Sequence, residues 1–82
     1  MFHIEWTARA LKEAEKLESE VFRRIFQKVD ELKEDPFSKD IKRLKGETSF
    51  RLRVGDYRAI FEIERDTIFI TKIGHRKNIY DF

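Results

Sequence analysis

The stretch FRLRVGDYRAIF, residues 50–61, decides the fold of this 82-residue chain. Two runs that alternate apolar and polar residues flank Gly55–Asp56, and a two-residue loop with glycine first is typical of a type II′ β-hairpin. This turn sets a register in which Arg53 lies directly opposite Arg58. Like charges that face each other across a β-ladder destabilise it, so this pair needs an explanation.

The residues before this hairpin predict one strand and two helices. The segment 2–6 (FHIEW) alternates and is rich in β-formers, so it predicts a short strand. Thr7 is a good N-cap for a helix over 8–17, and Ser19 is one for a helix over 20–35. The second helix should end at Asp35–Pro36, because the residue before proline avoids the α region. Two amphipathic helices joined by so short a link should pack as an antiparallel hairpin.

Period-two alternation dominates the second half of the chain. It predicts strands over 49–54, 57–64 and 67–73, with residues 38–47 as a basic connector. The fold class is therefore α+β, with an N-terminal strand and a helical hairpin packed on a small antiparallel β-sheet. The order is β-α-α-β-β-β, in a single domain spanning 1–82 with both helices on one face of the sheet.

The opposite face of this sheet should be basic. Ile60 lies at its centre, surrounded by Arg51, Arg53, Arg58, Glu62 and Thr71. These side chains are either the ordinary solvated side of a half-buried sheet or a ligand surface. An anion would relieve the repulsion between neighbouring arginines, and the planar guanidinium binds phosphate well.

Charge is distributed unevenly between the two halves of the chain. Residues 1–38 carry seven basic and nine acidic side chains, whereas residues 39–82 carry eleven basic and seven acidic ones. A polyanionic partner should therefore meet a patch in the C-terminal half. The absence of cysteine and of a signal-like N-terminal run favours a cytoplasmic protein. No pattern with metal-ligand spacing and no phosphate-binding loop occurs, so no cofactor is expected.

The final segment, KIGHRKNIYDF (72–82), places His75, Arg76 and Tyr80 near one rim of the sheet. Arg58 is predicted to pair with Ile73, which would bring Arg76 close to the basic face. A cationic surface edged by a histidine and a tyrosine suits RNA, with phosphates on arginine and a base on the tyrosine ring. Each residue also has an ordinary explanation: His75 as a surface side chain, and Tyr80 as a residue that closes the core.

The motifs RLKG (43–46), RLRVGDYRAIF (51–61) and IGHRKNIY (73–80) resemble those of the RelE/ParE toxin superfamily of bacterial and archaeal toxin–antitoxin systems. This resemblance covers essentially the whole chain and implies a RelE-like toxin domain. Its RelE branch implies a ribosome-dependent mRNA endonuclease that enters the ribosomal decoding site. The ParE branch implies the alternative, a non-catalytic inhibitor of DNA gyrase. The resemblance also implies a cognate, RelB-like antitoxin as partner, which lays a helix across the helices or covers the basic face with acidic residues.

The resemblance also implies roles for individual residues in a metal-independent reaction. Arg53 and Arg58 would hold the scissile phosphate, and Arg76 would do the same from the other side or assist the leaving oxygen. Tyr80 would stack on or orient a base. His75 is not part of the resemblance, and is assigned as the proton carrier because imidazole is the side chain best suited to that role. Further RNA contacts are expected from Arg51, Lys42, Arg43 and Lys45. The best-known RelE enzyme has lysines at the positions that match 51 and 53. Arginine does not readily release its proton, so the general base is not identified.

Overall fold

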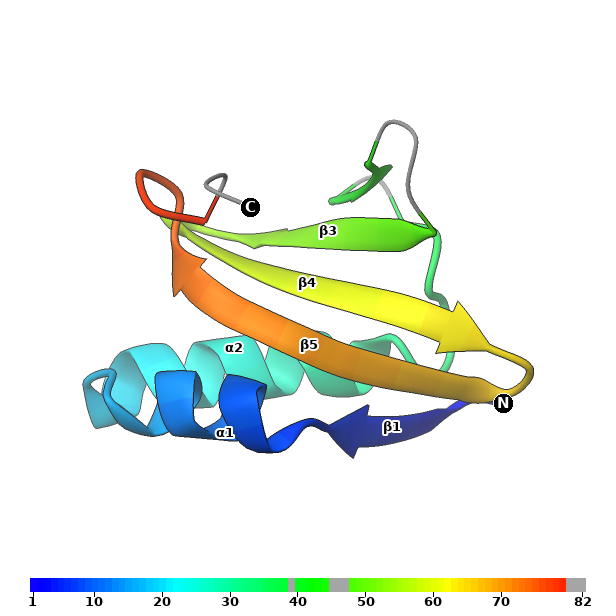
Figure 1. The fold of residues 1–82 in the computed structure, drawn as a ribbon, viewed down its shortest axis with the longest axis horizontal. Helices are drawn as coiled ribbons and strands as arrows, with labels where there is room; N and C mark the ends of the chain where they lie inside the picture. The colour runs from blue at the N-terminus through cyan, green and yellow to red at the C-terminus, as the bar shows by residue number, and fades with distance from the viewer. Residues whose placement is uncertain (39, 45–47, 80–82) are drawn as a thin grey trace.

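The computed structural model describes residues 1–38, 40–44 and 48–79. Its element order is β1 (His3–Trp6), α1 (Ala8–Glu15), α2 (Ser19–Glu31), β2 (Ile41–Arg43), β3 (Ser49–Val54), β4 (Tyr57–Glu64) and β5 (Thr67–His75). Five strands form one sheet in the order β1-β5-β4-β3-β2, and both helices cover the same face (Figure 1). The α+β class and the placement of the helices are confirmed. We call the face against α1 and α2 the inner face and the opposite one the outer face.

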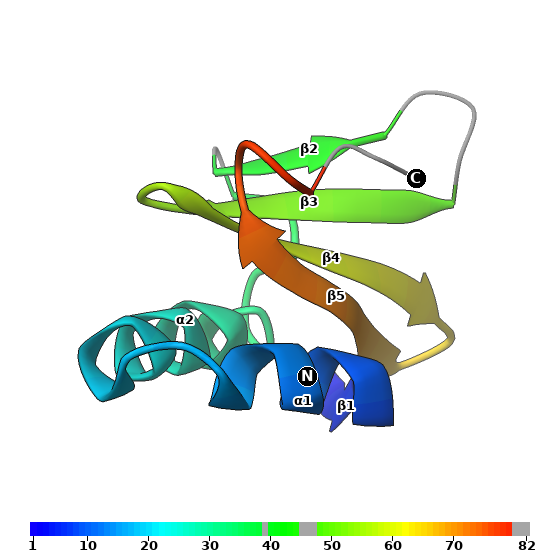
Figure 2. The same ribbon diagram turned by 60° about the vertical axis from the view of Figure 1, so that its left-hand side comes forward.

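The sheet differs from the predicted one in two respects. It is mixed, because β1 pairs in parallel with β5, whereas β2 to β5 form an antiparallel meander. The helical hairpin carries the chain from one sheet edge to the other, and the meander returns it beside β1. The predicted connector also contains a strand, β2, which pairs along the edge of β3 (Figure 2). In this pairing Ile41 lies opposite Leu52.

The β3–β4 hairpin is as predicted. Arg53 pairs with Arg58 across it, and Gly55 has a φ of +59°. A side chain at position 55 would be strained by this φ, and its Cβ would lie 3.0 Å from an Nη atom of Arg24. The next turn has a similar φ of 58° at Arg65, without a glycine to accommodate it.

The register between β4 and β5 is shifted by a β-bulge. From Phe61 to Glu64 the pairing is the predicted one, but Ile60 pairs with Lys72, and Arg58 pairs with Gly74 instead of Ile73. Thr71 is the extra residue of the bulge, and its hydroxyl donates to the Ile60 carbonyl at 3.2 Å. The shift turns Lys72, and not Thr71, toward the same face as Ile60.

The helix ends depart from the sequence pattern at three points. Thr7 caps α1 as predicted, since its Oγ1 accepts from the Ala10 N–H at 3.2 Å. The N-cap of α2 is Glu18, which makes no side-chain capping bond, so the prediction of a Ser19 cap is wrong. α1 ends at Glu15 and α2 at Glu31, each before its predicted limit. Turns follow α2, and the Asp35 carboxylate accepts from the Phe37 N–H at 3.0 Å. Apolar periodicity continues past the last helical hydrogen bond, which is why it overestimates both lengths.

The core fills the space between the helices and the inner face. Phe61 is fully buried at its centre and stacks on Phe50 with ring centroids 5.4 Å apart. Buried residues from both layers surround it: Ala10, Ala14, Ile25, Val29, Leu32, Leu52, Val54, Ala59, Ile68, Ile70 and Ile73. This core fixes which residues of each strand are left for the outer face. In the described ranges, neither helix is long and apolar enough to cross a bilayer.

Candidate nucleic-acid interface

Basic side chains form two rows across the outer face. In the first row the register joins Lys42, Arg51, Ile60 and Lys72 on four neighbouring strands. In the second row, next to the hairpin turn, it joins Arg53, Arg58 and Gly74. Residues paired across antiparallel strands point to the same face, so these cations share one surface. The predicted grouping of Arg51, Arg53 and Arg58 on one face is therefore present.

Arg58 is the unusual member, because its side chain is only 8% exposed. Its Nη1 donates to the carbonyls of Gly55 and Tyr57, both at 2.8 Å. Its Nε is buried without a hydrogen-bond partner, and no carboxylate within the described residues lies within 4.0 Å of the guanidinium. A buried cation is costly without an opposite charge, so this group favours an anionic ligand.

Arg53 and Arg76 approach the same turn from two other segments. Arg53 Nη2 lies 3.5 Å from Asp40 Oδ1, and Arg76 Nε lies 3.9 Å from Asp56 Oδ1. Both arginines are more than half exposed, and exposed ion pairs of this length contribute little. The backbone N–H of Arg76 also donates to the Asp56 carbonyl at 2.8 Å. Arg58 and Arg76 thus both contact the Gly55–Asp56 turn, and Arg53 lies on the strand that leads into it.

The turn after β5 lies on the outer face, away from the helices (Figures 1 and 2). The Ile79 N–H donates to the His75 carbonyl at 3.0 Å, and Ile79 is 1% exposed. A Cβ at Gly74 would come within 3.1 Å of Ile79 Cδ1, so Ile79 packs over this glycine, which belongs to the second row together with Arg58. Gly74 therefore gives room for the chain to fold back over the sheet.

Several of the predicted site residues are not brought into these rows. His75 pairs with Tyr57, on the inner-face side, with ring centroids 5.4 Å apart, and its Nδ1 accepts from the Lys77 N–H at 3.1 Å. Arg43 pairs with Phe50, which also belongs to the inner face. Lys45 and Tyr80 lie outside the described residues.

Lys72 is the residue that the sequence pattern missed. The predicted register was counted from the Arg65–Asp66 turn, and one extra residue in β5 reverses every side chain beyond it. Gly74 was the signal in the sequence that could have corrected this register. A glycine in a strand can mark a close approach of another chain segment, which here folds back over the outer face. Lys72 lies two residues before Gly74 and therefore shares its face.

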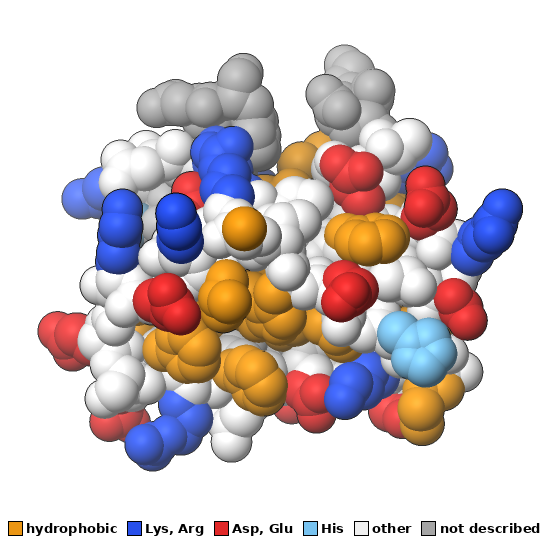
Figure 3. Space-filling model, turned by 60° about the horizontal axis from the view of Figure 1, so that its bottom comes forward, with side chains coloured by type: hydrophobic (Ala, Val, Ile, Leu, Met, Phe, Trp, Pro, Cys, Tyr) orange, Lys and Arg blue, Asp and Glu red, His pale blue; other side chains and the backbone are white. Residues whose placement is uncertain are grey.

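An aromatic strip lies on a different surface, between β1 and α2. Trp6 stacks on Phe26 with ring centroids 6.2 Å apart, and Phe26 stacks on Phe22 at 6.3 Å. Phe26 is 49% exposed despite this stacking. A groove beside it is lined by Ile4, Trp6, Phe26, Val29, Asp30 and Lys33. Figure 3 shows apolar side chains gathered on this side of the molecule, with charged ones around them.

The groove follows an open edge of the sheet. Among the described strands, β1 pairs only with β5, and the backbone N–H groups of His3 and Thr7 donate to the carbonyls of Asp66 and Ile70 on that side. Backbone groups of a strand alternate in direction, so those of Ile4 and Trp6 point away from β5. An unpaired strand edge beside an apolar groove is a surface to which an extended peptide can add.

A metal site in a protein is usually built from several His, Cys, Asp or Glu side chains that lie close together. Within the part of the chain that the structure describes, no three of them come together. The outer face carries guanidinium and ammonium groups, which bind and neutralise phosphate oxygens.

Comparisons with known proteins find a matching family model, a curated relative and solved structures with the same fold. The model of the family described as the ParE toxin of the type II toxin–antitoxin system parDE matches residues 4–80. The curated Toxin RelE3 of Methanocaldococcus jannaschii is 48% identical over 44 residues, which are 52% of this chain and 50% of that protein. The match thus spans about half the length of this relative.

Solved structures extend the similarity to the whole fold. A chain in the crystal structure of the RelB–RelE antitoxin–toxin complex from Methanococcus jannaschii has a TM-score of 0.77 at 30% identity, over 94% of this chain and 95% of that one. A chain of the chromosomal ParDE system from P. aeruginosa has a TM-score of 0.79 at 15% identity, over 92% and 96%. The second likeness concerns the fold alone. On the family match and these structures, the chain belongs to the RelE/ParE superfamily of toxins of type II toxin–antitoxin systems.

Proposed function

We propose that this toxin is a metal-independent endoribonuclease that cuts mRNA on the ribosome and so stops translation. The observation that carries the proposal is Arg58, a buried guanidinium whose Nε has no hydrogen-bond partner among the described residues, on a surface shared with Arg53. Arg76 reaches the same turn from the C-terminal segment. Such a group of fixed cations suits a phosphate on which negative charge grows during reaction.

In the proposed reaction, the 2′-oxygen of one nucleotide attacks the adjacent phosphorus and loses its proton. The P–O5′ bond breaks, and the 5′-oxygen takes up a proton as it leaves, so a 2′,3′-cyclic phosphate and a 5′-hydroxyl are formed. Arg53 and Arg58 hold the non-bridging oxygens, and Arg76 stabilises the leaving oxygen. Most of the acceleration would come from alignment and fixed positive charge.

Proton transfer is the step with the least support from the protein's own side chains. His75 is the proposed proton carrier, but its ring packs against Tyr57 on the inner-face side. To serve the outer face it would have to leave this contact. Stacking of a base by Tyr80 remains part of the proposal.

The alternative function is ParE-like inhibition of DNA gyrase without catalysis. The matching family model carries the ParE description, and the ParDE structure shares the fold. A common fold does not distinguish the two functions, because function depends on the site. The proposed Arg53, Arg58 and Arg76 group favours the nuclease.

An antitoxin related to RelB is the proposed partner, as in the complex from Methanococcus jannaschii. We propose that an extended apolar segment of it adds to the open edge of β1 and covers the aromatic strip. An exposed stack of Trp6 and Phe26 supports this mode, because large aromatic side chains supply much of the energy of protein interfaces.

The deciding experiment adds the purified toxin to a translation extract and maps the 5′ ends of a reporter mRNA. Codon-phased cuts that disappear with Arg58→Ala support the nuclease. An intact message, together with altered supercoiling of a plasmid by gyrase, supports the alternative.

A further inference from the structure

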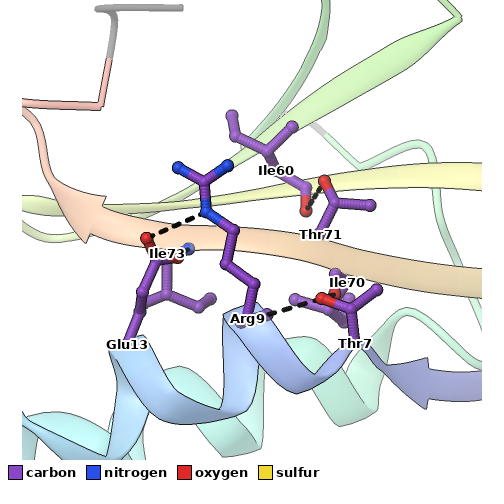
Figure 4. Close-up of polar contacts among 8 residues, drawn as sticks. Thr7, Arg9, Glu13, Ile60, Ile70, Thr71 and Ile73 are labelled. Carbon is purple, nitrogen blue, oxygen red and sulfur yellow. Dashed lines mark hydrogen bonds and ion pairs between the residues drawn. The ribbon is translucent and has the colours of Figure 1, made fainter.

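The bulge in β5 is held from both sides of the strand. On one side the Thr71 hydroxyl donates to the Ile60 carbonyl at 3.2 Å. On the other, Glu13 of α1 accepts the Ile73 N–H at 2.8 Å, and Arg9 Nε lies 3.3 Å from the second carboxylate oxygen of Glu13 (Figure 4). The register of this strand end is therefore fixed by side chains and not only by the ladder.

The fixed register determines which face Lys72 occupies. Ile60 separates it from Arg51 in the first row, and Gly74 of the second row is two residues further along β5. With strands about 4.8 Å apart, the backbone positions of Lys42 and Lys72 are about 14 Å apart across three strand spacings. Cations thus extend across the sheet, perpendicular to the strands and past the Arg53–Arg58 pair.

From this row we infer that Lys72 contacts a backbone phosphate of the RNA and that the RNA strand crosses β2 to β5 instead of following one of them. The inference rests on the proposed nuclease function and adds a path and a residue to it. A lysine is suited to this role, because its compact ammonium binds phosphate as a point charge from a flexible stem. Ile60, which lies between Arg51 and Lys72 in this row, is only 4% exposed, so the contacts with the RNA come from the flanking cations.

The salt dependence of binding gives a direct test. Neutralising one phosphate of a single strand contributes about 0.7 to the slope of log affinity against log salt concentration. The test uses the full chain and a fluorescent single-stranded RNA with 2′-O-methyl groups, which cannot undergo the 2′-oxygen attack. Anisotropy titrations at several salt concentrations give the slope for each variant.

Lys72→Gln should lower the slope by about 0.7 and weaken binding several-fold at low salt, whereas Lys72→Arg should keep the slope of the unaltered protein. The matched control is Lys12→Gln, an exposed lysine on α1 on the other side of the sheet, which should change neither quantity. Thermal unfolding of all three variants separates loss of charge from loss of fold. Should Lys72→Gln unfold, the Lys72→Arg variant and a Thr71→Val variant, which loosens the bulge, are compared instead.

Two outcomes overturn different claims. If the unaltered toxin binds the RNA and cuts mRNA but Lys72→Gln and Lys12→Gln give equal slopes, Lys72 is not a phosphate contact and the proposed function stands. If the unaltered toxin neither binds RNA nor cuts mRNA in the extract, the proposed function falls and the RNA path falls with it.

Discussion

The outer face and the aromatic strip each present side chains that need a partner: cations on the first surface and aromatic rings on the second. On the outer face, Arg53 and Arg58 are cross-strand neighbours, and Arg58 is buried without a carboxylate partner among the described residues. On the strip, Phe26 stays half exposed although Trp6 and Phe22 stack on it. Among the described residues, the first surface carries more positive than negative charge, and the second lacks apolar cover.

The difference indicates two partners of different chemistry. A concentration of positive charge is relieved by a polyanion, with an affinity that falls as salt screens or replaces it. Exposed aromatic rings are covered by a protein chain, with an affinity that depends little on salt. Because both helices lie on the inner face, each surface can be altered without touching the other.

Removing the guanidinium of residue 58 should have the largest effect. Arg58→Ala should lower the rate of mRNA cleavage in the extract by about 10²–10³-fold, as the loss of one preorganised donor to a transition-state oxygen does. Antitoxin affinity, measured by isothermal titration, should stay unchanged. Arg23→Ala, an exposed arginine of α2, serves as the control. Equal cleavage by both variants contradicts the assigned role of Arg58.

A charge on the aromatic strip should give the converse result. Phe26→Glu should weaken antitoxin binding by about 2 kcal/mol or more, roughly 30-fold, because a carboxylate replaces a central aromatic contact. Cleavage by the free toxin should not change. Phe37→Glu is the matched control, since Phe37 is also exposed but contacts Phe50 on β3. A toxin that loses antitoxin binding only with an Arg51/Arg53/Arg58 triple alanine variant would place the antitoxin on the outer face instead.

The two β-turns with positive φ test whether the outer face depends on its backbone. Gly55→Ala should destabilise the fold by about 1 kcal/mol and disturb the Arg53–Arg58 pair, lowering RNA affinity with little effect on antitoxin affinity. Arg65→Gly, at the other turn, should stabilise by a similar amount and leave both affinities intact. Chemical denaturation gives the stabilities. A destabilised Arg65→Gly would mean that the strain at this turn is negligible.

The smallest effect is expected from the carboxylate beside Arg53. Asp40→Asn removes an ion pair of 3.5 Å, so Arg53 becomes more available to phosphate and RNA affinity at low salt should rise about two- to threefold. Lys28 also loses a contact with Asp40, which accounts for a slight loss of stability. Unchanged RNA affinity would indicate that Arg53 does not contact the RNA.

The predictions from sequence succeeded where an element depends on neighbouring residues. Thr7 caps α1, and the Gly55–Asp56 turn aligns Arg53 with Arg58, because each feature is decided within a few residues of chain. They failed where distant segments decide. The bulge at Thr71 is held by hydrogen bonds to the Ile60 carbonyl and from the Ile73 N–H to Glu13. β1 forms its parallel ladder with β5, and β2 pairs with the edge of β3, so both strands depend on distant segments.

The sequence by itself therefore determined the α+β class, the hairpin and the cationic character of one sheet face, since alternation and turn chemistry are local properties of the chain. Only the tertiary structure decided that Arg58 is buried, that Lys72 joins the basic rows and that His75 does not. For Lys72 and His75 the physical reason is that one extra residue in β5 reverses the direction of every side chain beyond it. Contacts with other segments, and not the sequence of β5 alone, hold that residue in place.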